Sequence, residues 1–257
     1  MHKTQLTLSA RDVHKSFGSG PRRAPVLRGV SMEASRGETI FLVGPSGSGK
    51  TTLLSVLGCI LTPDGGSVEV LGRDVAKMTP AELTAFRREN LGFIFQSFNL
   101  FPTLSAQDNV ALALTMRGAS ARAAVRRAGE LLNEVGLGPR RHARPAQLSG
   151  GECQRVAVAR ALAGDPAVVF ADEPTASLDA ENGQTVMGLL TRLVRERGVT
   201  LVVVTHDNRI FPYADRILSL EDGRVAHEWV PTESHEPAAP AAGLHPERLR
   251  FLKERVA

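Results

Sequence analysis

The chain has 257 residues, of which 42% are apolar and 23% charged, and these values suit a globular protein with a real core. No apolar run approaches the ~18 residues that a membrane span needs, and the first residues lack the apolar core of a signal peptide. We therefore expect a cytosolic chain that does not cross a bilayer alone. The net charge of +4 invites a nucleic-acid partner, but the arginines are scattered without clustered aromatic residues, which favours a solvated basic surface and no nucleic acid. Cys59 and Cys153 are too few for a disulfide framework, and we expect two buried thiols in helix-like settings.

Two strands are expected before the first chemical motif. Residues 6–13 alternate between apolar and polar, and residues 27–32 form a second strand after a Gly- and Pro-rich loop at 18–25. Phe17 lies just before this loop and is a candidate stacking platform for a nucleobase, because any aromatic face stacks on adenine. A position in the core is the equally weighted alternative for Phe17.

A P-loop pattern follows the apolar strand at residues 39–43. Its residues are Gly44, Pro45, Ser46, Gly47, Ser48, Gly49, Lys50, Thr51 and Thr52. The glycines allow backbone N–H groups to wrap a polyphosphate, and a helix at 52–57 turns its positive end toward it. We expect Lys50 to reach the β- and γ-phosphates and the Thr51 hydroxyl to ligate Mg²⁺. A glycine-rich turn without a ligand is disfavoured, because such a turn has no use for Gly-Lys-Thr at the start of a helix.

The middle of the chain changes from alternating strands and helices to helices alone. A turn at 62–66, a strand at 67–71, a helix at 80–90 and a strand at 91–95 come first. Gln96 ends the last strand, where open α/β sheets bind ligands, although by itself it is only a polar strand end. Helices at 109–117 and 121–135, the second closed by Gly136 and Leu137 in a Schellman-like arrangement, indicate an inserted helical subdomain.

A long helix opens at Ser149, Gly150, Gly151 and Glu152. Ser149 and Glu152 have the spacing of a capping box, which is a purely structural interpretation. Two consecutive glycines weaken a helix start but leave its N–H groups open to an anion. Both interpretations hold together if the capped helix end faces a phosphate.

Two further apolar strands end in polar residues. The strand at 167–171 leads into Asp172, which we expect in the Mg²⁺ shell, and Glu173, which we expect to polarise an attacking water. A solvated acidic turn is the alternative, and the upstream P-loop disfavours it. The strand at 199–205 ends in His206, which is a candidate γ-phosphate sensor or proton-transfer group, although a lone histidine is more often structural.

In this order, the motifs GPSGSGKTT, Phe-Gln, LSGGE, VVFADEP, SLD and THD closely resemble the ATP-binding subunit of ABC transporters over about residues 4–227. The resemblance implies an α/β fold, with a RecA-like P-loop core, an N-terminal antiparallel β subdomain and a helical insert at about 97–160. It also implies ATP and Mg²⁺ as cofactors and ATP hydrolysis as the activity. Phe17 stands where the family usually has tyrosine, and Cys153 where a polar residue is common.

The resemblance also implies roles for single residues. Gln96 would touch Mg²⁺ and relay to a membrane subunit. Ser149, Gly150 and Gly151 would contact the γ-phosphate that the other subunit of a head-to-tail homodimer holds. Asp179 would be the D-loop residue, and His206 the switch residue.

Within the family, residues 95–106 and 205–210 look like the lipoprotein-releasing and macrolide-exporter branch, near the heterocyst glycolipid exporter ATPases. This implies export or lipid extraction through a separate membrane permease, often with a periplasmic adaptor, and a peripheral place on the cytoplasmic face of the inner membrane. Phe98, Leu100, Phe101 and Leu104 offer a docking groove for a permease helix, or else close the insert's own core.

The sequence disfavours two other functions. A non-transport ABC ATPase of cell division, DNA or ribosomes commonly carries long coiled coils or two cassettes, and this chain has no sustained heptads and one cassette. An ATP-holding switch without turnover is disfavoured by Glu173. The tail, residues 228–257, is interpreted as a Pro- and Ala-rich linker followed by a short helix at 244–256 that docks, packs back or stays mobile.

Overall fold

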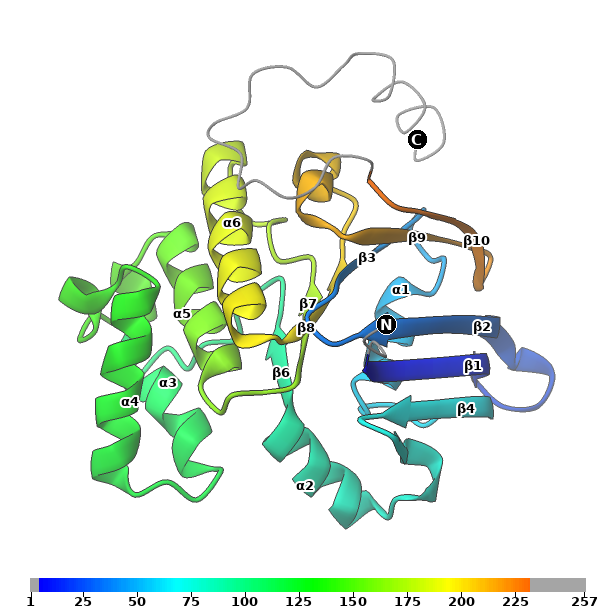
Figure 1. Ribbon diagram of the computed structural model, residues 1–257, viewed down its shortest axis with the longest axis horizontal. Coiled ribbons are helices and arrows are strands. Elements are labelled where there is room, and N and C mark those ends of the chain that lie inside the picture. The colour runs from blue at the N-terminus through cyan, green and yellow to red at the C-terminus, as the bar shows by residue number, and fades with distance from the viewer. Residues whose placement is uncertain (1–4, 232–257) are drawn as a thin grey trace.

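The computed structural model describes residues 5–231, so the helix expected in the tail and the linker from residue 232 on lie outside the described residues. Residues 228 and 229, expected in the linker, instead end the last strand. Two sheets, with helices packed around them, make up this part of the chain (Figure 1). The α-helices are α1 (Lys50–Leu57), α2 (Pro80–Asn90), α3 (Ala106–Thr115), α4 (Ala121–Glu134), α5 (Gly150–Leu162) and α6 (Ala180–Arg197). Short 3₁₀ helices are η1 (Gly20–Arg22), η2 (Val75–Lys77), η3 (Gly138–Arg140), η4 (Pro145–Gln147) and η5 (Asn208–Tyr213). No helix within 5–231 is long and apolar enough to span a membrane.

The larger sheet is six-stranded, in the order β10-β9-β3-β8-β7-β6. Its strands are β3 (Thr39–Val43), β6 (Leu91–Ile94), β7 (Val168–Asp172), β8 (Thr200–Val204), β9 (Arg216–Glu221) and β10 (Arg224–Trp229). All neighbours pair in parallel except β10, which runs antiparallel to β9. β3 and β8 are buried along their whole length, as a parallel sheet covered on both faces requires. The expected α/β core is confirmed, and the carboxyl ends of β3, β7 and β8 meet at one edge.

Alternate residues of these strands pack into two separate cores, one on each face of the sheet. Ile40 and Leu42 of β3 pack with the buried side of α1 and with the smaller sheet. Phe41 and Val43 pack with α5, α6 and the helical insert. Figure 1 accordingly shows α3, α4, α5 and α6 together on one side of the molecule and the smaller sheet on the other. The helices α1 and α5 therefore lie on opposite faces of the same sheet.

The smaller sheet is antiparallel, in the order β2-β1-β4-β5, and confirms the expected N-terminal β subdomain. Its strands are β1 (Leu6–Phe17), β2 (Ala24–Ser35), β4 (Gly65–Val70) and β5 (Arg73–Asp74). The predicted ends at residues 13, 27 and 32 were wrong. The β1–β2 pairing continues to Phe17 opposite Ala24, because bulges absorb the irregular stretch that hides the alternation.

The helical insert holds α3 and α4. The predicted start of α3 at residue 109 was wrong, because the Ser105 side chain accepts the Asp108 N–H and caps the helix three residues earlier. The Schellman arrangement after α4 is confirmed. Gly136 has φ +72° and donates to the Asn133 carbonyl at 3.0 Å, and Leu137 donates to the Leu132 carbonyl at 2.7 Å.

Candidate nucleotide-binding site

The predicted P-loop joins the carboxyl end of β3 to α1. Gly44, Gly47 and Gly49 have φ values of +137°, +79° and +102°, which glycine adopts without steric cost. A Cβ on Gly44 would lie 2.1 Å from the Leu220 carbonyl oxygen, so no other residue fits there. Gly49 is the N-cap of α1, and no side chain caps this helix. The first N–H groups of α1 are therefore offered to an anion together with the loop.

Lys50 is folded across this loop. Its Nζ donates to the carbonyl oxygens of Gly44 at 2.9 Å and Pro45 at 2.8 Å. Burial lowers the pKa of Lys50, and the nearby charges of Glu173 and Asp172 oppose that shift. The ammonium is thus held between the glycine loop and two carboxylates, where it faces any phosphate that the loop wraps.

Thr51 and Asp172 meet where α1 begins and β7 ends. The Thr51 hydroxyl donates to Asp172 Oδ1 at 3.2 Å. Burial raises the pKa of Asp172, while the Thr51 hydrogen bond and Lys50 lower it. A hydroxyl and a carboxylate are hard oxygen donors of the kind that Mg²⁺ prefers, so these two residues fit that ion. Within residues 5–231 no group of three or more His, Cys, Asp or Glu side chains is placed to hold a metal. Phosphate and water oxygens would have to complete the shell.

Glu173 and His206 are joined by a short contact between their side chains. His206 Nδ1 and Glu173 Oε1 are 2.7 Å apart, although 33 residues separate them in the chain. Glu173 has φ +49°, and its N–H donates to the Val204 carbonyl at 2.9 Å, which holds this left-handed backbone. Its second oxygen, Oε2, is buried without a hydrogen-bond partner. The carboxylate therefore keeps one oxygen free to accept a proton.

Three further predicted residues lie outside the strands of the larger sheet. Gln96 is exposed two residues beyond β6, and its carbonyl accepts the Ser177 hydroxyl at 3.1 Å. Asp179 caps α6 through the Asn182 N–H at 2.9 Å. Phe17 is 44% exposed, with Lys15 Nζ 5.8 Å from the centre of its ring, so a core position for Phe17 was wrong.

The residues at the start of α5 are not brought to the P-loop. Ser149 and Glu152 form the predicted capping box, with the Glu152 N–H on Ser149 Oγ at 3.2 Å and the Ser149 N–H on Glu152 Oε2 at 2.8 Å. A Cβ on Gly151 would lie 2.9 Å from Asn182 Oδ1, so a larger residue there would displace the end of that side chain. Because α5 and α1 pack on opposite faces of the sheet, one chain contains two separate helix ends suited to phosphate.

Sequence patterns do not reveal the clamp that holds the end of β1 near Phe17. Asp64 accepts Lys15 Nζ at 2.9 Å, the Ser16 N–H at 2.8 Å and Arg23 Nη2 at 3.1 Å. In the sequence, Asp64 is only the acid of a Pro-Asp-Gly turn, and its three donors come from other elements. Both thiols are buried as predicted, but Cys59 follows α1 with φ +58° and is not helical.

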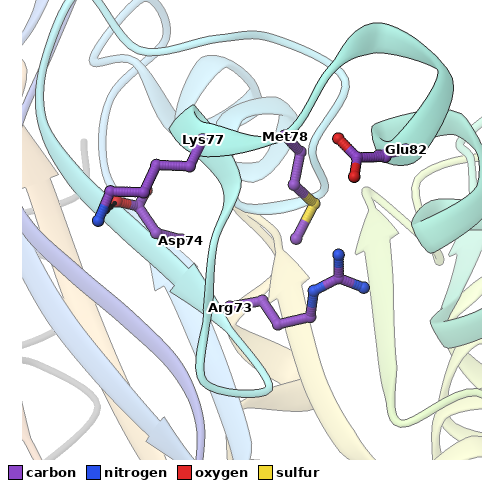
Figure 2. Close-up of a pocket in the computed structure, with 5 residues that line it drawn as sticks. All are labelled: Arg73, Asp74, Lys77, Met78 and Glu82. Atoms are coloured by element: carbon purple, nitrogen blue, oxygen red, sulfur yellow. Dashed lines mark ion pairs between the residues drawn. The ribbon is translucent and has the colours of Figure 1, made fainter.

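The structure also contains a pocket apart from this site (Figure 2). It measures about 230 Å³ and is lined by Arg73, Asp74, Lys77, Met78 and Glu82. Asp74 caps η2 and pairs with Lys77 at 3.1 Å, and Glu82 belongs to the capping box of α2. These polar groups are already used by the local fold, and none of the P-loop residues lines this pocket.

The fold and the site define a P-loop nucleotide-binding protein with an acidic strand end. The model of the ABC transporter family matches residues 27–176, and the chain belongs to this family as an ATP-binding cassette. It is 46% identical over 94% of its length to the macrolide export ATP-binding/permease protein MacB 1 of Aeromonas hydrophila, and spans 36% of that protein. It is 47% identical to an uncharacterised ABC transporter ATP-binding protein of Thermotoga maritima, covering 83% of this chain and 91% of the relative.

Solved structures give the same fold. The dimeric ATP-binding cassette MJ0796 in a post-hydrolysis state with ADP and Pi has a TM-score of 0.80 and 40% identity, covering 87% of this chain and 98% of that chain. The CbiO1 subunit of a Clostridium perfringens ABC transporter complex has a TM-score of 0.79 and 27% identity, covering 87% of this chain and 88% of that one.

Proposed function

We propose that this chain binds ATP with Mg²⁺ and hydrolyses it to power export, or lipid or lipoprotein extraction, through a separate membrane permease. The observation that carries the proposal is the convergence at one sheet edge of Lys50, the Thr51–Asp172 pair and the Glu173–His206 pair. Positioning and electrostatic stabilisation are what phosphoryl transfer requires of a protein. We infer that the ATP-binding domain comprises about residues 4–227, with its helical insert at about 97–160.

Each residue of the site has a proposed role in hydrolysis. The P-loop N–H groups and Lys50 bind the phosphates, and Phe17 stacks on the base. Thr51, Asp172 and Gln96 would hold Mg²⁺, which neutralises charge on the phosphate oxygens. Glu173 accepts a proton from the attacking water at its unpartnered oxygen, and His206 fixes the other oxygen.

A second copy of the chain completes the site in this proposal. Ser149, Gly150 and Gly151 of one copy contact the γ-phosphate held by the P-loop of the other, and Asp179 lies between them. The separation of α5 from α1 supports this, because one chain cannot turn both helix ends toward one nucleotide. The dimeric state of the MJ0796 cassette also supports it.

The proposed partner is a membrane permease. The macrolide export relatives are named as ATP-binding/permease proteins, and this chain spans 36% of the first of them. We propose that the chain works at the cytoplasmic face of the inner membrane, where it meets the permease and, through it, a periplasmic adaptor.

The proposed docking surface is the loop before α3. Phe101 is 52% exposed, whereas Leu100 packs partly against the core. The buried Asn109 side chain holds the backbone of Phe101 on both sides, accepting its N–H at 2.8 Å and donating to its carbonyl at 3.1 Å. An exposed ring on a fixed backbone suits a docking contact, because little conformational entropy is lost on binding. The inward leucine supplies the packed floor, so the two interpretations of this segment are compatible.

The test is recovery of partners by the tagged full-length chain from native membranes. Wild type should bring down a permease, and Phe101→Asp should reduce that recovery about tenfold, or about 1.4 kcal/mol, while ATP binding stays intact. Ile60→Asp is the matched control, because Ile60 is 48% exposed and lies outside the helical insert. Equal recovery with Phe101→Asp would refute the docking surface. Recovery of ribosomes, DNA or a division protein in place of a permease would support the non-transport alternative.

A further inference from the structure

The turn that follows Gln96 has an unfavourable backbone. Phe98 and Asn99 are consecutive residues with φ values of +60° and +48°. Residues with a Cβ rarely adopt this left-handed conformation, and two in succession are more costly still. The turn is closed by the Phe98 N–H on the Phe95 carbonyl at 3.1 Å and the Asn99 N–H on the Ser97 carbonyl at 2.6 Å. A conformation of this kind persists only where the surroundings hold it.

Arg160 of α5 binds this turn through hydrogen bonds to its carbonyl groups. Its Nη2 donates to the Phe98 carbonyl at 2.7 Å, and its Nη1 donates to the Asn99 carbonyl. The planar guanidinium thus binds both carbonyls of the left-handed pair in one fork. Among the ion pairs of residues 5–231 none involves Arg160, so its partners are these carbonyls and no carboxylate. Burial lowers the pKa of Arg160, as expected of a guanidinium taken from water without an acid beside it.

Other contacts fix the same turn from the sides. The Ser177 hydroxyl donates to the Gln96 carbonyl at 3.1 Å, from the loop that leads to Asp179. The Phe98 ring lies near the start of α5, since a Cβ on Gly150 would come within 3.8 Å of it. The backbone of Gln96 is therefore held at two points. Ser177 binds its own carbonyl, and Arg160 binds the carbonyls two and three residues later.

We propose that Arg160 is a positioning residue for ATP hydrolysis, which holds the strained turn at 98–99 and thereby keeps Gln96 in place at the edge of the sheet. The inference rests on the proposed function, because it assigns Arg160 a part in that reaction. It extends the site from the loop that carries Gln96 into the third turn of α5. The alternative is that Arg160 only packs α5 against the insert.

The experiment uses the full chain with four variants: Arg160→Met, Asn99→Gly, the double variant and Arg126→Met. Methionine keeps the aliphatic stem of Arg160 but removes both donors. Glycine at 99 accepts a positive φ without cost, so the turn depends less on the two Arg160 hydrogen bonds. Arg126 is an exposed arginine of α4, and its substitution controls for the loss of a guanidinium.

Two readouts are measured for each variant. In hydrogen exchange, Arg160→Met should speed the amides of Phe98 and Asn99 by about tenfold or more, while amides of α4 stay unchanged. In steady-state ATP hydrolysis, it should lower kcat about 10- to 100-fold with KM for ATP within about twofold, because misplacing a reacting group affects the chemical step and the P-loop is untouched. The kcat of the double variant should be at least about threefold higher than the kcat of Arg160→Met.

Three results would overturn the inference: kcat near wild type in Arg160→Met, a rise in KM that accounts for the loss, or no recovery with Asn99→Gly. Arg126→Met should match wild type in both readouts. Failure of the proposed function is seen separately, since it would appear as absence of ATP hydrolysis in the wild-type chain, whereas the exchange of the turn is measured without nucleotide.

Discussion

Replacing Glu173 with glutamine tests the chemistry of the site most selectively. The amide has the same shape and can still bond His206, whichever ring nitrogen carries the proton, so the 2.7 Å contact and the left-handed backbone remain. What is lost is the basic oxygen that we propose accepts a proton from water. The side chain is only 17% exposed, so bulk water does not readily replace it as a base.

The expected loss follows from these contacts. Removal of a general base lowers turnover by about 10² to 10⁴, which corresponds to about 2.7 to 5.4 kcal/mol of activation free energy. ATP affinity should stay the same or rise, because a carboxylate near the γ-phosphate has been neutralised. Single-turnover release of inorganic phosphate measures the first quantity, and titration with a fluorescent ATP analogue measures the second.

Glu82→Gln is the matched control, because it makes the same change in the capping box of α2 away from the site. It should hydrolyse ATP like wild type. A kcat for Glu173→Gln within about threefold of wild type would remove Glu173 from the role of base. A parallel loss of ATP binding would show that the substitution disturbs the P-loop instead.

Three other outcomes are expected. Lys50→Ala should weaken ATP binding at least about tenfold by calorimetry, because it deletes the charge held over the P-loop, and an unchanged isotherm would contradict that. Asp64→Asn should lower the thermal unfolding temperature at neutral pH. Hydrogen bonds, above all the one from Lys15, lower the pKa of Asp64 to about 2, below the ~3.9 of an unfolded chain. The ionised Asp64 carboxylate therefore stabilises the fold above about pH 4, and this stabilisation is lost as pH falls through about 2. A difference from wild type that is as large at pH 2 as at pH 7 would refute this origin. Burial raises the pKa of Cys59 to about 11, so native protein should react with thiol reagents at pH 8 far more slowly than protein in urea, and equal rates would show that the thiol is accessible.

The P-loop could be predicted from the sequence because its signals are local. An apolar strand, glycines at positive φ and a helix start follow one another within a few residues. The capping box at Ser149 and the Schellman end at Gly136 are local in the same way. Short-range geometry of this kind does not depend on the rest of the fold.

The pairing of Glu173 with His206 could not be predicted, because it depends on strand order. β7 and β8 are neighbours in the sheet, so their carboxyl ends meet although α6 separates them in the chain. The sequence alone leaves His206 as a lone histidine. The Arg160 contact with Phe98 and Asn99 is hidden for the same reason, since more than 60 residues separate the partners.

Three elements, α6, β9 and β10, are not predicted from the sequence. For α6 the signals exist, since Asp179 caps its start and Gly198 ends it at φ +62°, but Asp179 was interpreted only as part of a loop. β10 is an edge strand whose residues are mostly exposed, so it lacks the apolar alternation that identifies a strand.

The central claim is that one chain holds half of an ATP site and that a second copy supplies the other half. Light scattering of the Glu173→Gln chain with and without saturating Mg-ATP tests it most directly, because this variant binds ATP without releasing it by hydrolysis. We expect a monomer of 27.5 kDa without nucleotide and twice that mass with ATP. Adding Ser149→Arg to the Glu173→Gln chain should abolish the dimer, because Ser149 is proposed to meet the nucleotide of the other copy. Each chain should still bind one ATP. Two results together would show that a single chain forms the whole site. The Glu173→Gln chain would remain at 27.5 kDa with one ATP bound, and the wild-type chain would hydrolyse ATP at a specific rate independent of protein concentration.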